Sequence, residues 1–210
     1  MPLIETTIWN HSLHLETDER LFSPRQPDKG TMAMLAQVDL RPADMVLDLG
    51  CGYGLVGLAA ALVLAPEQVT MVDIDPLAVE TASRNAALNS LAGVRIICGD
   101  GPAAAAPDLF SLILCNPPYH TDFSVAKRLI EQSVQRLLPG GRLFFVIKRL
   151  DWYRNKMTGV FGGVRVIPVD GYYVLVSEKR DKGKGSAGHP AATTRTTRKH
   201  LKKMKKHLVG

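Results

Sequence analysis

Short apolar runs alternate with longer amphipathic segments through the middle of the chain. The apolar runs are typical of buried strands, and they predict strands over residues 45–49, 69–72, 94–98, 112–115 and 142–147. Between them, apolar residues recur at helical spacing. This spacing predicts helices over residues 55–64, 76–88 and 124–138, and an earlier helix over residues 31–40.

Two further apolar runs, residues 164–169 and 172–177, flank Asp170-Gly171, a turn dipeptide that favours a β-hairpin. Alternating strands and helices indicate βαβ units and a parallel sheet covered on both faces, and the hairpin makes the last strand antiparallel. We therefore predict an α/β fold: a Rossmann-like, doubly wound, seven-stranded and mostly parallel sheet with an antiparallel last strand. One domain is predicted over residues 1–180, with an N-terminal cap segment over residues 1–40.

The end of the chain has a different composition. Residues 178–210 hold eleven Lys or Arg and two acids, whereas residues 1–177 hold fifteen Lys or Arg and eighteen acids. Residues 181–210 begin with small polar residues that cannot bury a core, so they predict a flexible basic tail. Residues 195–208 carry most of this charge and are predicted to bind a polyanion, since Lys and Arg neutralise phosphates without regard to sequence.

The composition excludes a wholly disordered chain and a collagen-like chain. Hydrophobic residues make up 46% and charged residues 22%, as in ordinary globular proteins. The three cysteines are scattered, and no Cys or His cluster has zinc-binding spacing, so we expect no metal. There is neither a signal-like start nor an apolar run of about 20 residues, so we expect a cytoplasmic protein without a membrane span.

A glycine-rich loop follows the strand at residues 45–49. Gly50, Gly52 and Gly54 allow the backbone to turn tightly and to approach a ligand closely. The spacing differs from the GxGxxG of dinucleotide dehydrogenases, and Asp48 beside the loop disfavours a phosphate and favours a cation. Asp73, at the end of the next strand, can accept from ribose hydroxyls, and Asp100 after the third can accept from an adenine amino group. These acids suit S-adenosylmethionine.

A second motif, Asn116-Pro117-Pro118-Tyr119, ends the strand at residues 112–115. The prolines stop strand pairing and make the backbone rigid. An exocyclic amino group is a poor nucleophile, and the carbonyl oxygens of Asn116 and Pro117 can orient it and stabilise the positive charge that develops on it. Tyr119 can stack on a planar target. The motif therefore predicts methyl transfer to a planar nitrogen.

The glycine loop, the segment 72–76 and the position of Asp100 resemble the first three motifs of class I S-adenosylmethionine-dependent methyltransferases. The resemblance extends over roughly residues 20–178. It implies that the glycines cradle the cofactor, that Asp73 binds the ribose and that Asp100 lies by the adenine; for Asp75 we prefer the interpretation of a helix cap. The predicted cofactor-binding residues are Asp48, Gly50, Cys51, Gly52, Gly54, Asp73, Ile74, Asp100, Asn116 and Thr31.

Asn116-Pro117-Pro118-Tyr119 resembles the motif of methyltransferases that act on guanine N2, adenine N6 or glutamine N5. Residues 21–31 resemble the segment before the glycine loop in the small-domain ribosomal RNA guanine-N2 enzymes, which favours guanine N2. With this resemblance, the polyanion expected to bind residues 195–208 is RNA, either ribosomal RNA or a ribosomal subunit. The predicted catalytic residues are Asn116, Pro117 and Tyr119, and the predicted substrate-binding residues are Pro118, His120, Phe22 and Lys29. Two alternatives stay open: a glutamine-N5 or adenine-N6 methyltransferase, and a non-catalytic RNA-binding protein that keeps the fold.

Overall fold

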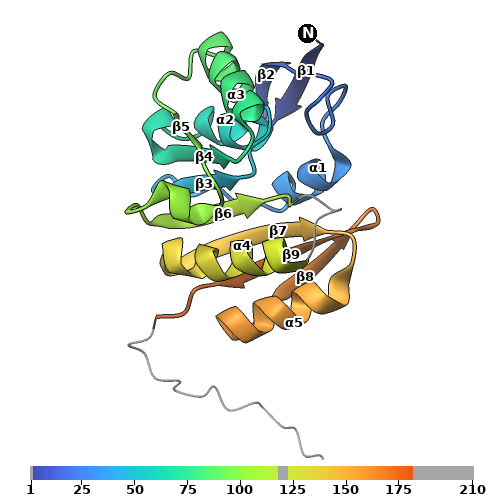
Figure 1. The fold of residues 1–210 in the computed structure, drawn as a ribbon, viewed down its shortest axis with the longest axis vertical. Coiled ribbons are helices and arrows are strands. Elements are labelled where there is room, and N and C mark those ends of the chain that lie inside the picture. The colour runs from blue at the N-terminus through green and yellow to red at the C-terminus, as the bar shows by residue number, and fades with distance from the viewer. Residues whose placement is uncertain (1, 118–122, 182–210) are drawn as a thin grey trace, which may run out of the picture.

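A seven-stranded sheet forms the centre of the molecule (Figure 1). The structure is a computed structural model that describes residues 2–117 and 123–181. The sheet has the order β5-β4-β3-β6-β7-β9-β8. Its strands are β3 (Val46–Leu49), β4 (Val69–Asp73), β5 (Arg95–Cys98), β6 (Phe110–Cys115), β7 (Leu137–Ile147), β8 (Arg165–Val169) and β9 (Tyr172–Glu178). β9 is antiparallel to both of its neighbours and the other adjacent pairs are parallel, which confirms the predicted fold class.

Helices cover both faces of the sheet. Strand β7 shows the division, because Phe144 packs in one hydrophobic cluster and its neighbour Phe145 in another, as the two-residue period of a strand requires. The cluster around Phe144 includes residues of α1 (Lys29–Leu35), α2 (Leu55–Ala61) and α3 (Pro76–Leu88). The cluster around Phe145 includes residues of α4 (Phe123–Arg136) and α5 (Leu150–Phe161). Two short 3₁₀ helices, η1 (Pro66–Gln68) and η2 (Pro102–Ala105), precede β4 and β6.

The strand order creates a crevice between β3 and β6. From β3 the chain moves outward through β4 to β5 and then returns to place β6 on the other side of β3. The connections after β3 and β6 therefore lead to opposite faces, and in open α/β sheets ligands bind outside the carboxyl ends of the strands at such a switch point. The glycine loop follows β3 and Asn116 follows β6, so the topology brings the two predicted motifs to this crevice.

An antiparallel hairpin over β1 (Leu3–Ile8) and β2 (His11–Glu16) was not predicted. Its apolar residues alternate over strands of only six residues, so the periodic signal is short. β2 packs on α3, where the Asn85 and Asn89 side chains accept hydrogen bonds from the Glu16 and His14 backbone amides at 2.7 and 3.0 Å. These asparagine side chains satisfy backbone groups that a strand edge otherwise leaves unpaired.

Helix α5 was also not predicted, and several predicted bounds were wrong. α5 buries only Met157 and Phe161, so its apolar pattern is weak. The helix predicted over residues 124–138 ends at Arg136, and Leu137 already belongs to β7. The helix predicted over residues 31–40 is the shorter α1, and the one predicted over residues 55–64 ends at Ala61.

Among the described residues, no helix combines the length and apolar character that crossing a bilayer requires. Within the same residues, no three His, Cys, Asp or Glu side chains lie close enough together to hold a metal ion.

Candidate functional site

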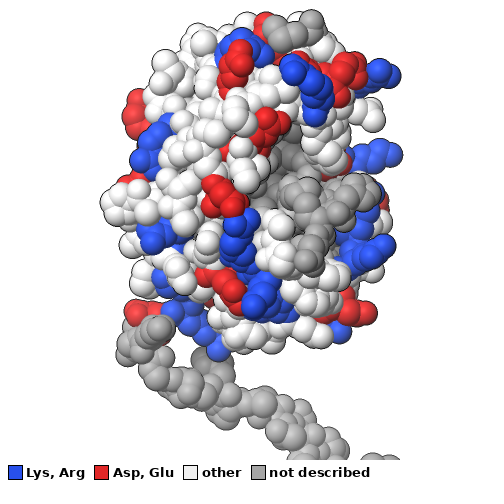
Figure 2. Space-filling view, in the orientation of Figure 1, with Lys and Arg blue, Asp and Glu red and all other residues white. Residues whose placement is uncertain are grey.

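A cavity of about 320 Å³ lies at the carboxyl edge of the sheet, between the ends of β3, β4 and β6. Figure 2 shows acidic side chains at the border of a hollow in this face of the molecule. The carboxylates that line the cavity are Asp28, Asp48, Asp73, Asp75 and Asp100. An acidic cavity suits a ligand that carries positive charge and disfavours a phosphate.

The glycine loop forms one wall of the cavity. Gly50 and Gly52 adopt φ values of +75° and +55°, a left-handed backbone that residues with a Cβ rarely adopt. A Cβ placed on either residue would meet no heavy atom within 4 Å, so the loop presents open space to a ligand. Gly54 does not line the cavity; it precedes α2 with φ +96°.

Asp73 holds the glycine loop in place. One of its carboxylate oxygens accepts a hydrogen bond from the Gly52 amide at 2.8 Å, and the other accepts from the Asp75 amide at 3.0 Å. Each carboxylate oxygen has a second lone pair, so Asp73 retains the capacity to accept from hydroxyl groups. Asp75 caps α3 through a 2.9 Å hydrogen bond from the Leu77 amide, with Pro76 as the first helical residue, as predicted.

Asp48 is the most deeply buried carboxyl group of the cavity, with only 3% of the residue exposed. It accepts a hydrogen bond from the Gly57 amide of α2 at 2.8 Å. Burial, with a smaller contribution from the charge of Asp73, raises the pKa of Asp48 to about 7 despite the opposing effect of the Gly57 hydrogen bond. Asp48 is therefore partly protonated near neutral pH, and a cation in the cavity would favour its ionised form.

The lining of the cavity also combines exposed apolar groups with a further acidic group. Ile74 and Phe22 line the cavity with 65% and 57% of their surfaces exposed, which is unusual for large apolar residues and provides contact area for a planar group. Asp100 lines the same cavity, and its carboxylate is paired with Arg128 of α4, including a 2.8 Å hydrogen bond to Nη2. The predicted adenine contact of Asp100 stays a prediction.

Asn116 lies across the crevice from the glycine loop. Its amide nitrogen donates to the Asp28 carboxylate at 2.9 Å and to the Thr31 hydroxyl at 2.8 Å. Asp28 also caps α1, because the same carboxylate oxygen accepts from the Thr31 amide at 2.8 Å. The N-terminal segment thus reaches over the sheet edge and holds the side chain that follows β6.

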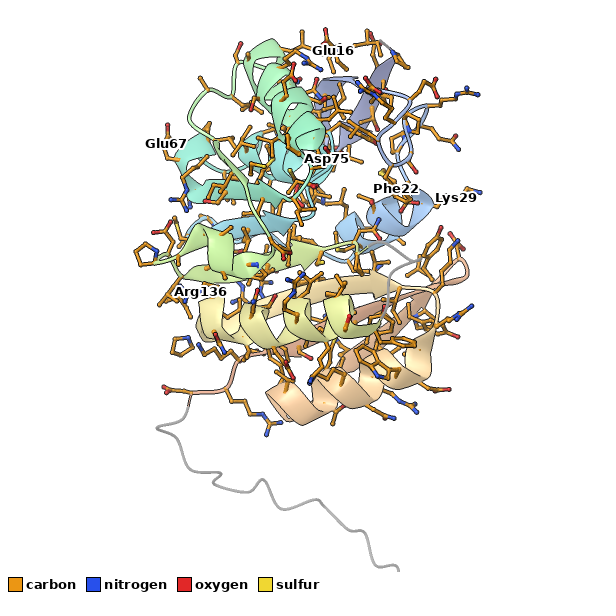
Figure 3. All side chains as sticks on the ribbon, in the orientation of Figure 1. Glu16, Phe22, Lys29, Glu67, Asp75 and Arg136 are labelled. Carbon is orange, nitrogen blue, oxygen red and sulfur yellow. The ribbon has the colours of Figure 1, made fainter. Side chains whose placement is uncertain are left out.

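Most of the predicted site residues come together around this cavity. Those that line it are Phe22, Thr31, Asp48, Gly50, Cys51, Gly52, Asp73, Ile74, Asp100, Asn116 and Pro117. Lys29 does not line it, and Figure 3 shows Lys29 projecting outward from α1. Pro118, Tyr119 and His120 lie outside the described residues, as does the predicted RNA-binding segment 195–208.

The family of the chain follows from comparison with known proteins. Residues 12–177 match the family described as methyltransferase small domain, and this range contains the glycine loop, the acids at the strand ends and Asn116. The chain belongs to the methyltransferase small domain family. The match covers the seven-stranded sheet except its last residue, Glu178, and all of the residues that line the cavity.

Relatives in this family are named for ribosomal RNA methylation. The chain is 36% identical over 159 residues to the ribosomal RNA small subunit methyltransferase C of Pseudomonas putida strain W619, covering 73% of this chain and 47% of the relative. It is 33% identical over 180 residues to the ribosomal RNA large subunit methyltransferase G of the same strain, covering 80% of this chain and 47% of the relative. The chain therefore spans about half the length of these relatives.

Solved structures share the fold. The T. thermophilus 16S rRNA N2 G1207 methyltransferase, solved in complex with AdoMet and guanosine, matches with a TM-score of 0.78 and 26% identity. The match covers 85% of this chain and 50% of that one. A methyltransferase from Pyrococcus furiosus matches with a TM-score of 0.67 at 20% identity, which supports the fold alone.

Asp28 and Gly57 are parts of the site that the sequence analysis did not identify. Asp28 lies in the segment 21–31 that carries the resemblance, and an Asp three residues before Thr31 has the spacing of a helix cap. Gly57 donates to Asp48, and a Cβ on it would lie 2.3 Å from the Met71 sulfur, so only glycine lets α2 approach Asp48 this closely.

An aromatic group beside the crevice was missed because α5 was missed. Phe123 begins α4, directly after the segment that follows Asn116, and Trp152 and Tyr153 lie in the first turn of α5. The ring centroids of Phe123 and Trp152 are 4.7 Å apart, and those of Trp152 and Tyr153 are 5.0 Å apart. Planar side chains thus gather where both helices begin.

The buried cysteines of the cavity are unsuited to covalent chemistry. Cys51 and Cys115 both line it, and burial raises the pKa of each thiol well above its ordinary value. The reactive form of cysteine is the thiolate, so these residues act as small apolar groups.

A larger hollow of about 570 Å³ lies elsewhere, where β7 begins and β9 ends, and contains none of the predicted site residues.

Proposed function

We propose that this protein transfers a methyl group from S-adenosylmethionine to the exocyclic N2 of a guanine in ribosomal RNA. The observation that carries the proposal is the juxtaposition of two motifs. The glycine loop after β3 and the anchored Asn116 after β6 line one acidic cavity at the switch point of the sheet. The family to which the chain belongs supports the same chemistry.

The residues of the cavity fit S-adenosylmethionine. Gly50 and Gly52 leave open space for close approach, and Asp73 has acceptor capacity for ribose hydroxyls. Ile74 supplies an exposed apolar surface for a planar base, and Asp48 supplies a carboxyl group that a cation would ionise. The cofactor, when bound, supplies an electrophilic methyl group on a positively charged sulfur.

The chain's own residues then have to present a nucleophile in line with that methyl group. The carbonyl oxygens of Asn116 and Pro117 accept hydrogen bonds from the N–H groups of the target amine, which orients its lone pair. The new N–C bond forms as the S–C bond breaks, and positive charge develops on the amine. The same two oxygens stabilise this charge until the amine releases a proton to water. Neither a metal nor a covalent intermediate is needed for this reaction.

The assignment of the substrate rests on the relatives and on the character of the surface. The relatives are named for ribosomal RNA, and the T. thermophilus structure contains guanosine. Near the crevice, Phe123 and Trp152 offer planar surfaces, and the exposed Lys148 and Arg149 follow β7 at its carboxyl end. Aromatic and basic groups together suit single-stranded RNA. We assign residues 195–208, with seven Lys or Arg, to sequence-independent contact with the RNA backbone.

The experiment that tests this function uses isotopically labelled S-adenosylmethionine. The full chain is incubated with under-methylated ribosomal RNA, with ribosomal subunits and with release factors, and the products are digested and identified by mass spectrometry. Label in N2-methylguanosine would support the proposal. Label in N6-methyladenosine or in glutamine would keep Asn116 in its role but make the proposed substrate wrong. No label in any product, together with no cofactor binding, would favour a non-catalytic RNA-binding protein.

A further inference from the structure

The anchoring of Asn116 uses both hydrogens of its amide nitrogen. One is directed to the Asp28 carboxylate at 2.9 Å and the other to the Thr31 hydroxyl at 2.8 Å. The Thr31 hydroxyl in turn lies 3.4 Å from the same Asp28 oxygen. The three side chains form a closed set of hydrogen bonds between residues that are 88 and 85 positions apart in the chain.

This arrangement determines which end of the amide can meet a substrate. A carboxylate only accepts hydrogen bonds, so the amide nitrogen, and not the amide oxygen, has to face Asp28. The torsion that turns an asparagine amide is broad and roughly two-fold, so an unanchored amide would turn its nitrogen to the substrate in part of the molecules. An amine that attacks with its lone pair needs acceptors for its N–H groups, and the wrong orientation of the Asn116 amide would present donors to it.

The charge of Asp28 has a second effect. A carboxylate that accepts from the amide N–H groups polarises the amide and increases the negative charge on its oxygen, because linked hydrogen bonds strengthen one another. The oxygen of Asn116 then stabilises a developing positive charge better than a free amide oxygen would. Asp28 lines the same cavity as Asn116, in a site where water screens charges less than in bulk solution.

We propose that Asp28 is a positioning residue for the methyl transfer, which fixes the amide of Asn116 with its oxygen toward the target amine and polarises that oxygen. This proposal rests on the proposed function. It assigns Thr31 to the same hydrogen-bonded set, in addition to the cofactor contact predicted for it. It also gives the N-terminal segment a catalytic purpose besides covering the cavity.

Two substitutions separate positioning from folding. Asp28→Ser keeps an N-cap for α1, because serine caps helices as well as aspartate does, but its hydroxyl is one bond shorter and cannot also reach Asn116. Asp28→Asn keeps the shape and loses the charge. The matched control is Asp108→Ser, which removes an exposed carboxylate paired with Arg95 just before β6, at the amino-terminal edge of the sheet.

Steady-state kinetics with labelled S-adenosylmethionine and under-methylated ribosomal RNA give the first readout. Asp28→Ser is expected to lower kcat by about 100-fold, the lower end of the loss found when one preorganised hydrogen bond to a reacting group is removed. Asp28→Asn keeps the shape of the side chain and is expected to lower kcat by less, about 10-fold. In both variants, the cofactor affinity should stay within about twofold of the wild type and the thermal midpoint within about 3 °C. The control variant Asp108→Ser should keep full activity. An Asp28→Ser protein that binds cofactor and keeps at least half of kcat would overturn the proposal, as would a fall in kcat matched by an equal fall in cofactor affinity.

Proton exchange of the Asn116 side-chain amide gives a readout that needs no turnover. Its NMR signals are assigned by their loss in Asn116→Asp. The hydrogen directed to residue 28 should exchange at least about 10-fold faster in Asp28→Ser than in the wild type, because its acceptor is lost. Equal exchange rates would overturn the proposal even if the wild type is active. Conversely, protected hydrogens in a wild type that methylates no guanine would leave the anchoring intact and make the proposed substrate wrong.

Discussion

The unusual pKa of Asp48 predicts that cofactor affinity depends on pH. The carboxyl group is buried beside the glycine loop, and its pKa is raised to about 7. In the free protein, lowering the pH from 8 to 6 therefore converts Asp48 from mostly ionised to mostly protonated. A positively charged sulfur in the cavity favours the ionised form, so binding at pH 6 has to displace a proton.

The size of this effect follows from the linkage between the two equilibria. An opposite charge within about 4–6 Å lowers a carboxyl pKa by about 1–3 units. With a fall of about 2 units, Asp48 has a pKa of about 5 in the complex, and the affinity at pH 6 is about 10-fold lower than at pH 8, or about 1.4 kcal/mol. The direction follows from the sign of the charge: affinity rises as the pH rises through 7.

Isothermal titration calorimetry with two ligands tests this reasoning. S-Adenosylmethionine should bind about 10-fold more weakly at pH 6 than at pH 8. S-Adenosylhomocysteine carries a neutral sulfur and is the matched control, whose affinity should change by less than about twofold. Asp48→Asn should remove the pH dependence for the charged ligand. The reasoning would be refuted if both ligands followed the same pH profile, or if the Asn variant kept the wild-type slope.

Four further predictions concern single parts of the molecule. Asn116→Ala should lower kcat by about 100- to 1,000-fold with cofactor affinity nearly unchanged, because it removes an acceptor for the developing charge; loss of cofactor binding in a calorimetric titration would contradict this role. Asp48→Asn should raise the free energy of unfolding at pH 8 by up to about 4 kcal/mol. The pKa of Asp48 is higher in the folded than in the unfolded protein, so the protonated carboxyl group stabilises the fold at low pH and this stabilisation is lost as the pH rises through 7. Urea titrations at pH 5 and pH 8 measure the difference, and a variant less stable than the wild type at pH 8 would count against the prediction. Gly57→Ala should lower the free energy of unfolding by about 1–3 kcal/mol, since the new Cβ would overlap Met71, and a thermal midpoint equal to the wild type would show that the core accommodates it. Replacing the four lysines at positions 202, 203, 205 and 206 by glutamine should reduce the slope of log affinity against log salt for RNA by about 3; an unchanged slope would mean that the tail does not contact RNA.

The fold was predictable because the central strands carry a strong signal. All four residues of β3 and four of five in β4 are buried, so these segments appear as short, mostly apolar runs that Asp48 and Thr70 interrupt. The hairpin β1–β2 was not predicted because it is short and its backbone is completed by Asn85 and Asn89 of α3, contacts that no local pattern reveals. α5 was missed for a related reason: it is held by two buried residues and by aromatic contacts at its start.

The candidate site was predictable where a residue's role depends on its neighbours in the chain. The glycine loop and Asp73 follow directly from the strands that they end. Asp28 was missed because its partner, Asn116, follows β6 and lies 88 positions later in the chain, and a cap interpretation already explains an aspartate before a helix. The pKa of Asp48 was likewise not predictable, since it depends on burial beneath α2 and not on local sequence.

The place of β3 in the sheet also has a consequence for synthesis of the protein. β3 pairs with β4, which follows it closely, and with β6, which leaves the ribosome much later. Gly50 and Asn116 are separated by 66 residues, which take about 3–13 s to translate at 5–20 residues per second. During that interval, the nascent chain has the first wall of the crevice without the second. The cavity is therefore complete only after translation has passed β6 and Asn116 can join the glycine loop.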